Sequence, residues 1–178
     1  MKLLEGKTAI ITGASRGIGK GIAQVFAQQG ANVAFTYSSS VEAANELEKE
    51  LNELGIKAKG YKSNAASFSE ADALVNEVLK DFGGVIDVLI NNAGVFSNES
   101  MADMDFAAIN QQLTINAVAP IRVTHALLHS LGVDAKVAMI TSRMGSIADN
   151  GSGGYIGYRM SKAALNAASV SLAHELKG

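Results

Sequence analysis

The sequence predicts an α/β fold, a doubly wound parallel sheet with helices on both faces. Short apolar runs alternate with longer amphipathic stretches along the chain, and this alternation is typical of parallel sheets. Right-handed crossovers between such strands place the helices on both faces. Glycine is frequent, at 18 of 178 residues, and proline occurs once, as expected where short glycine turns join the elements.

The first half of the chain predicts three strand–helix pairs. The run KTAIIT is short, apolar and followed by a glycine, so it is expected to form a buried strand. In the next stretch, Ile18, Ile22, Val25 and Phe26 recur at helical spacing, and Gly30 ends the helix as a C-cap. By the same criteria, the expected strands are residues 7–12, 31–37 and 56–63, and the expected helices are residues 17–30, 40–55 and 69–83.

The second half predicts two further pairs, which complete a single domain over residues 1–178. Strands are expected at residues 86–94 and 135–142, and helices at about 104–131 and 157–176. Pro120, the only proline, falls inside the first of these helices. Since proline has no N–H, the carbonyl of Asn116 four residues earlier loses its partner, and the helix is expected to kink there.

Composition and charge exclude several kinds of protein. The chain is 48% hydrophobic and 18% charged, with a net charge of −2, so neither a nucleic acid nor an anionic membrane is expected as a partner. It contains no cysteine, which rules out disulfides and thiolate metal sites. His125 and His129 share a helical face without further ligand residues, and no metal site is predicted. No secretory leader or membrane-length apolar run is recognised, so we expect a soluble cytoplasmic protein.

A glycine-rich turn, TGASRGIG at residues 12–19, lies between the first strand and the first helix. In that context, glycines let the backbone turn tightly and approach a phosphate, while the helix N-terminus offers free N–H groups and a positive dipole end. The alternative is a turn that only joins a strand to a helix. We favour a dinucleotide site, with cofactor contacts expected from Gly13, Ser15, Arg16, Gly17, Ile18 and Gly19.

The end of the second strand indicates which nucleotide binds. An NAD site usually has an acidic residue there, which bonds the ribose 2′-hydroxyl. The sequence here is FTYSSS, without an acid. Arg16 is expected to pair with a 2′-phosphate, to which Tyr37, Ser38 and Ser39 can donate hydrogen bonds. The sequence therefore favours NADP over NAD.

The tetrapeptide NNAG at residues 91–94 ends the fourth strand, at the edge of the sheet where ligands bind in this architecture. The small residues Ala93 and Gly94 leave room for the adenosine side of a nucleotide, and Asn92 is expected beside them. Asn91 and Asn92 can also tie neighbouring loops together. A turn without any binding role is the alternative interpretation.

Tyr158 and Lys162, in the stretch YRMSK, share one face of the last helix at i and i+4. An ammonium beside a phenol favours its ionised form, so Tyr158 is expected to give a proton to a carbonyl oxygen. Ser142, at the expected end of the fifth strand, is the candidate donor of a hydrogen bond to the developing alkoxide. Ser146 is the alternative. Asn116 is the fourth candidate, with its freed carbonyl expected to hold a water beside Lys162.

Together, the glycine turn, the NNAG tetrapeptide and the four candidate catalytic residues resemble the short-chain dehydrogenase/reductase family. The resemblance implies a Rossmann sheet, with Tyr158 as acid–base and Lys162 holding the nicotinamide ribose, so that both also contact the cofactor. It further implies that Asn64 and Ala65, after the third strand, flank the adenine.

The two halves of the chain resemble different branches of that family. Residues 1 to about 84 are similar to bacterial 3-oxoacyl-[acyl-carrier-protein] reductases. The second half, including the longer loop between Ser142 and Tyr158, is similar to C-factor-like members. The chain is therefore interpreted as a chimera joined near NNAG or, alternatively, as a divergent natural member.

Family members usually continue beyond the last helix into sixth and seventh strands and a lid over the nicotinamide. A chain without them is expected to expose its fifth strand, with Val137 and Met139 uncovered, to bind the cofactor weakly and to show little or no turnover. The resemblance also implies that the chain forms a homodimer or a homotetramer, with the fourth and last helices at the interface.

Three functions are compatible with these features. The first is NADPH-dependent reduction of a carbonyl, in a 3-oxoacyl thioester of fatty acid biosynthesis or in another ketone. The second is a nucleotide-binding scaffold with little turnover, and the third is a signalling or interaction role of the C-factor type. Loss of NADPH absorbance with a ketone distinguishes the first, binding without turnover the second, and partner activity that survives loss of Tyr158 the third.

Overall fold

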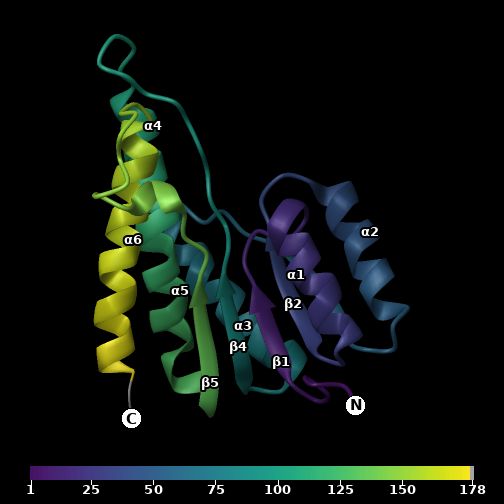
Figure 1. Cartoon of the computed structure of the whole chain (residues 1–178). Helices are drawn as coiled ribbons and strands as arrows, with labels where there is room; N and C mark the ends of the chain where they lie inside the picture. Colours follow the sequence, from purple (N-terminus) through teal and green to yellow (C-terminus); the bar gives the residue numbers. More distant parts are fainter. Residues whose placement is uncertain (177–178) are drawn as a thin grey trace. The chain divides into compact units, whose positions relative to one another are not determined.

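The structure, a computed structural model, describes residues 1–176, without the side chains of residues 68, 69 and 71 (Figure 1). The chain divides into two compact units. The first unit comprises Met1–Ala93 and Val123–Ala138, and the second comprises Gly94–Arg122 and the chain from Met139 onward. The glycine turn therefore belongs to the first unit, and the pair Tyr158 and Lys162 belongs to the second.

The first unit is built on a parallel sheet with the strand order β3-β2-β1-β4-β5. Its strands are β1 (Thr8–Ile11), β2 (Asn32–Tyr37), β3 (Ala58–Lys62), β4 (Ile86–Asn91) and β5 (Leu131–Met139). The register pairs Ala9 of β1 with Val33 of β2 and with Val88 of β4. The strand order reverses between β1 and β4, and ligands bind outside the carboxyl ends of the strands at such a point. The predicted α/β fold with five parallel strands is confirmed.

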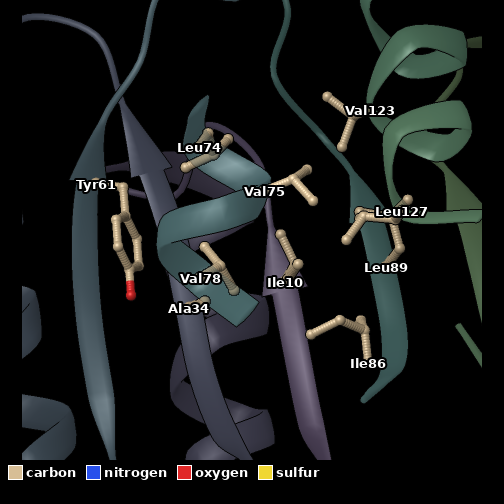
Figure 2. Packing of buried hydrophobic residues seen from close by; sticks show 10 residues of the cluster. All are labelled: Ile10, Ala34, Tyr61, Leu74, Val75, Val78, Ile86, Leu89, Val123 and Leu127. Atoms are coloured by element: carbon tan, nitrogen blue, oxygen red, sulfur yellow. The ribbon is translucent and has the colours of Figure 1, made fainter. Parts of the chain in front are cut away.

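Helices cover both faces of this sheet (Figure 1). They are α1 (Gly17–Gln28), α2 (Val41–Asn52) and α3 (Phe68–Phe82), together with the end of a later helix. On one face, Ile10, Ala34 and Leu89 of the strands pack with Val78 of α3 and with Leu127 of that later helix, as Figure 2 shows. This cluster is the apolar core on that face of the sheet, and its strands lead into the glycine turn and NNAG.

The predicted helix at about residues 104–131 is helical from Phe106 to Ser130 but departs from α-helical pitch in two places. It consists of α4 (Phe106–Leu113), the π turn η1 (Thr114–Val118), α5 (Ala119–Leu127) and the 3₁₀ turn η2 (Leu128–Ser130). The π turn contains Asn116, and the N–H of Ala119 donates to the carbonyl of Thr114. Because Pro120 has no N–H to offer, a wider turn just before it accommodates the missing hydrogen bond.

The fifth strand differs from its prediction at both ends. It was expected at residues 135–142, but β5 spans Leu131–Met139 and begins directly after η2. Gly132 lies against the start of β4, where a Cβ would come 3.4 Å from Val85 Cγ1. Pairing with β4 overrides the poor strand propensity of Gly132 and Asp134, which sequence patterns alone do not show. The expectation of an uncovered Val137 is also wrong, because this side chain is half-buried against the apolar core.

The second unit packs α4 and η1 against the last helix, α6 (Ile156–Glu175). A short 3₁₀ turn, η3 (Arg143–Gly145), also contacts α6. The chain enters α6 through Tyr155, whose φ of 52° makes it the one non-glycine residue with positive φ among those described. Such a backbone is uncommon for a residue with a side chain. None of the described helices has the length and apolar character needed to cross a membrane.

Candidate active site

The glycine turn between β1 and α1 is packed tightly against the loop that follows β4. Gly13 has a φ of 68°, and a Cβ there would lie 2.8 Å from the Cα of Ala93. A Cβ on Gly19 would lie 2.5 Å from Nδ2 of Asn92. Both contacts are closer than real Cβ atoms tolerate, so these two glycines are required by the approach of the two loops.

Hydrogen bonds fix the same two loops to each other. Oγ1 of Thr12 accepts from the N–H groups of Asn92 and Ala93, each at 3.0 Å. Nδ2 of Asn92 donates to the carbonyls of Thr12 and Gly13, at 3.0 and 2.9 Å. Both protons of the Asn92 amide are therefore used within the protein, and Asn92 acts here by shaping the loops that NNAG was expected to tie together.

Gly17 differs from its neighbours because it faces open space. Its φ is 59°, and no atom lies within 4 Å of the position that a Cβ would take. The N-terminus of α1 begins at this residue, and Arg16 at the N-cap provides no side-chain hydrogen bond to it. The N–H groups of the first turn thus lack a side-chain cap and lie beside open space, which is the arrangement that binds phosphate.

The residues expected to distinguish NADP from NAD come from two segments, the glycine turn and the end of β2, and most of them are exposed. Arg16, Ser38 and Ser39 are exposed, and Tyr37 is half-buried at the end of β2. No hydrogen bond or ion pair engages the Arg16 guanidinium among the described residues, so it is available to an anion. Of the other expected contacts in the turn, Ser15 is buried and Ile18 is exposed.

The residues expected beside the adenine follow β3. Asn64 is exposed, and its Oδ1 accepts from the N–H of Ala66 at 3.0 Å, so it shapes its own turn. Ala65 is half-buried. Asn64 and Ser38 also line an open cavity of 430 Å³ next to α3.

Tyr158 and Lys162 lie on one face of α6, as expected. The Nζ atom of Lys162 is 5.8 Å from the centre of the Tyr158 ring. Lys162 is only 5% exposed, and its Nζ donates to the carbonyl of Ile140 at 2.9 Å. Burial lowers the pKa of Lys162 below its usual value. A single described hydrogen bond leaves this amine with further donors to offer a ligand.

The two candidate serines both lie beyond the end of β5. Oγ of Ser142 caps η3 by accepting from the N–H of Met144 at 3.2 Å, and Oγ of Ser146 accepts from the N–H of Asp149 at 3.3 Å. Ser142 was expected at the end of the fifth strand, but it lies three residues beyond Met139, the last residue of β5. The turn that it starts is pressed onto α6, where a Cβ on Gly145 would lie 2.8 Å from the backbone carbon of Lys162.

Asn116 is almost completely buried, and its side chain is fully engaged. Its Oδ1 accepts from the N–H of Val95, and its Nδ2 donates to the carbonyl of Val95, both at 2.8 Å. Nδ2 also lies 3.0 Å from Oγ of Ser161. The expectation concerned the Asn116 carbonyl, but the side chain makes the contacts that reach α6, beside Lys162.

Three further residues near this site were missed by the sequence analysis. The ring of Phe96 meets the ring of Tyr158 edge-on, with centroids 4.9 Å apart. Glu99 and Gln112 are 2% and 1% exposed and hydrogen-bond to each other. No local pattern marks a buried carboxylate, because its burial depends on segments distant in sequence. Among the described residues, no group of histidines, aspartates and glutamates gathers closely enough to hold a metal ion.

Comparison with known proteins identifies the family that shares this arrangement. Residues 7–178 match the family model of the short chain dehydrogenases. Among solved structures, a short chain dehydrogenase from Burkholderia cenocepacia J2315 in complex with NADP superposes with a TM-score of 0.92 at 35% sequence identity. The match covers 97% of this chain and 69% of that chain.

Two relatives correspond to the two branches expected from the sequence. C-signal of Myxococcus xanthus is 50% identical over 97 residues, which are 53% of this chain and 58% of the relative. The 3-oxoacyl-[acyl-carrier-protein] reductase FabG of Staphylococcus epidermidis is 31% identical over 156 residues, which are 84% of this chain and 62% of the relative. Both predicted resemblances are confirmed. In each case the matched part is less than two thirds of the relative's length.

Proposed function

Because the chain belongs to the short-chain dehydrogenase family, we propose that it takes part in NADPH-dependent reduction of a carbonyl group to an alcohol. The observation that carries the proposal is the pair on α6, where a buried Lys162 lies 5.8 Å from the ring of Tyr158. None of the described hydrogen-bond partners of Tyr158 and Lys162 is a carboxylate. The substrate class is a ketone or a 3-oxoacyl thioester, the latter supported by the similarity to the reductase of Staphylococcus epidermidis.

NADP is the proposed cofactor, and the residues of the first unit fit it. The start of α1 has no side-chain cap, Gly17 faces open space, and the exposed Arg16 lies next to both in the chain. The end of β2 carries serines rather than an acid, so it does not repel a 2′-phosphate. The NADP complex of the Burkholderia relative supports the same choice. When bound, NADPH supplies the hydride.

The remaining cofactor contacts are proposed from the resemblance. Asn64 and Ala65 are assigned to the adenine, and Ala93 and Gly94 to the adenosine side. Lys162 is assigned to the hydroxyls of the nicotinamide ribose, for which a buried amine with donors to spare is suited.

Tyr158 and a serine are the proposed groups that act on the carbonyl oxygen. The carbonyl carbon receives the hydride, and its oxygen receives the proton of the Tyr158 hydroxyl, which leaves a phenolate. An ammonium at Lys162 favours that phenolate. Ser142 is proposed to donate a hydrogen bond to the oxygen as negative charge develops, because its Oγ accepts from Met144 and so retains its own proton for donation. Ser146 has the same capacity and is the alternative.

A signalling or interaction role is the second candidate. Its support is the similarity to C-signal of Myxococcus xanthus, which is 50% identical over the matched half of the chain. This role does not need the hydroxyl of Tyr158, whereas carbonyl reduction does.

We also propose that the chain forms a homodimer or homotetramer through α4, α5 and α6. Exposed apolar side chains include Phe106 of α4, Val118 of the adjoining π turn η1 and Val170 of α6. Burying such side chains against a second copy is favourable. Light scattering at tens of micromolar is the measurement, and a monomer would contradict the proposal.

The deciding experiment for the reaction is a cofactor titration followed by a panel of carbonyl substrates. NADPH binding is followed by fluorescence, and NADPH consumption by absorbance, with simple ketones and a 3-oxoacyl thioester. Turnover that disappears in Tyr158→Phe supports the reductase. Binding without turnover on any substrate favours the scaffold, and a partner activity that Tyr158→Phe retains favours the signalling role.

A further inference from the structure

Two buried polar side chains of the second unit reach α6 at equivalent positions. Gln112 and Asn116 are four residues apart, in α4 and η1, and therefore on the same side of that helical run. Asn116 contacts Ser161 directly, at 3.0 Å. Gln112 and the N–H of Gly157 both donate to the carboxylate of Glu99.

The positions contacted on α6 immediately precede the two residues of the proposed reaction. Gly157 comes before Tyr158, and Ser161 comes before Lys162. Since each pair on α6 is again four residues apart, one contact holds each turn that carries a reacting side chain. The contact at Ser161 involves Asn116, a residue already assigned to the site, and the contact at Gly157 has no assigned role.

Glu99 is the centre of this second contact. Its carboxylate is 2% exposed and accepts three hydrogen bonds from neutral groups. The donors are the hydroxyl of Ser97, Nε2 of Gln112 at 3.0 Å and the N–H of Gly157 at 3.2 Å. Gln112 is itself fixed, because its Oε1 accepts from the N–H of Ser97 at 3.1 Å. Burying a charged carboxylate without a cation costs free energy, and the three hydrogen bonds offset that cost.

Among the described residues, no other side chain caps the first turn of α6. Tyr155, at the N-cap, makes no side-chain hydrogen bond, and the first turn contains no acidic residue. Glu99 supplies both the acceptor and the negative charge that a helix N-terminus favours, from a segment 58 residues away in the chain.

Close packing makes this contact specific to a glycine. A Cβ on Gly157 would lie 2.5 Å from Nε2 of Gln112, 2.9 Å from Cγ1 of Ile109 and 3.0 Å from Oε2 of Glu99. A Cβ at residue 157 would therefore have to displace these side chains, which favours glycine where the N–H meets the carboxylate. The same segment supports the tyrosine from a second side, because the ring of Phe96 lies edge-on to the ring of Tyr158.

From these contacts we infer that Glu99 is a positioning residue for Tyr158, which fixes the first turn of α6 so that the phenol is held in its reactive place. Glu99 acts through the backbone of Gly157 and not on the substrate. The inference rests on the proposed reductase function, which gives Tyr158 its role. Asn116 and Glu99 are then two parts of one support, the first for the turn of Lys162 and the second for the turn of Tyr158.

The test compares Glu99→Gln with a matched control, Asp103→Asn. Glutamine keeps the shape of glutamate but has one accepting oxygen for the three donors. Its NH2 group therefore faces at least one of these donors and cannot accept a hydrogen bond from it. Asp103 is an exposed acid of the same segment, and its replacement removes the same charge. In Glu99→Gln we expect kcat for a ketone to fall about 10- to 100-fold, as small misplacements of reacting groups do. The KM and the NADPH dissociation constant should change less than about twofold, and Asp103→Asn should match the wild type.

A readout independent of turnover separates this inference from the proposed function. Amide hydrogen exchange should speed up at Gly157 and Tyr158 in Glu99→Gln, under conditions where both proteins stay folded, and the ring signals of a labelled Tyr158 should shift. Failure of the wild type to bind NADPH or to turn over would refute the reductase but not the support of Tyr158. Unchanged exchange and ring signals, or a kcat that falls equally in Asp103→Asn, overturn the role of Glu99.

Discussion

Two helix starts in this chain carry the predicted site, and they use the same physical property in opposite ways. The start of α1 has no side-chain cap, and its glycine, Gly17, faces open space. The start of α6 is capped by the buried carboxylate of Glu99, and its glycine, Gly157, is enclosed by protein atoms. Both have backbone N–H groups at the positive end of a helix. In α1 these groups have no side-chain cap, and in α6 the N–H of Gly157 donates to Glu99, next to the proposed proton donor Tyr158.

The difference shows how two glycines in similar sequence positions can have different purposes. Gly17 has a φ of 59° and space around it, so its requirement is one of backbone conformation and ligand approach. Gly157 has no positive φ among the described values, so its requirement is one of packing alone. A binding helix start is thus distinguished from a structural one by what a Cβ would meet.

Replacing the phenol tests the second helix start most strongly. Tyr158→Phe should lower kcat about 10²-fold or more, because it removes the proposed proton donor, and it should leave the NADPH dissociation constant nearly unchanged. Lys162→Met should damage both quantities. Steady-state kinetics and fluorescence titration measure them. More than a few per cent of residual activity in Tyr158→Phe would break the assignment of chemistry to α6.

Removing the exposed cation tests the first helix start. Arg16→Ala should weaken NADPH binding about tenfold or more, since a hydrogen-bonded charge pair contributes about 1.5–3 kcal/mol. NADH binding should change little, because NADH has no 2′-phosphate. Equal dissociation constants of the wild type for the two cofactors would contradict this prediction.

Adding a methyl group compares packed and open glycines directly. Gly157→Ala should lower the free energy of unfolding by about 1–3 kcal/mol, because the new Cβ collides with Gln112 and Ile109. Gly21 of α1 is the matched control, since no atom beyond its chain neighbours and its own helix backbone lies within 4 Å of its Cβ position. Gly21→Ala should raise the free energy of unfolding by up to about 1 kcal/mol through helix propensity. Urea unfolding measures both, and a stabilised Gly157→Ala would refute the packed start of α6.

The smallest expected effect is a pH dependence at Glu99. The hydrogen bond from Ser97, aided by those from Gln112 and Gly157, holds the pKa of the Glu99 carboxyl below its usual value. Since the folded pKa lies below the unfolded one, the carboxylate's contribution is complete above about pH 4.3 and is lost as the pH falls through the folded pKa. The wild type should exceed Glu99→Gln in stability by about 1 kcal/mol at pH 7. Urea titrations at pH 7 and in acid should show the gap narrowing, and a gap that widens in acid would contradict it.

The first helix start could be predicted from sequence, and much of the second could not. The turn TGASRGIG lies between adjacent elements, so local spacing was enough to place Gly13, Gly17 and Gly19. The support of Tyr158 joins Glu99, Gln112 and Gly157, which are distant in the chain and share no motif. Ser142 was placed at a strand end because apolar periodicity does not show where β5 stops pairing with β4. For Asn116, proline chemistry predicted the change in the helix at the right place but not the use of its side chain.

The π turn at Thr114–Val118 has a consequence for the phase of the helical run that contains it. It accommodates one residue more per turn than an α-helix, and each residue advances an α-helix by about 100°. The face that α5 turns toward the apolar core, with Val123 and Leu127, is therefore rotated from the one that an unbroken helix from Phe106 would present. Deleting a single residue of the π turn would restore regular winding and keep both side chains on the core face, whereas α-helical winding of the full-length stretch would rotate them away by about 100°. The number of residues in this stretch, and not only their identity, thus determines which side chains of α5 face the core.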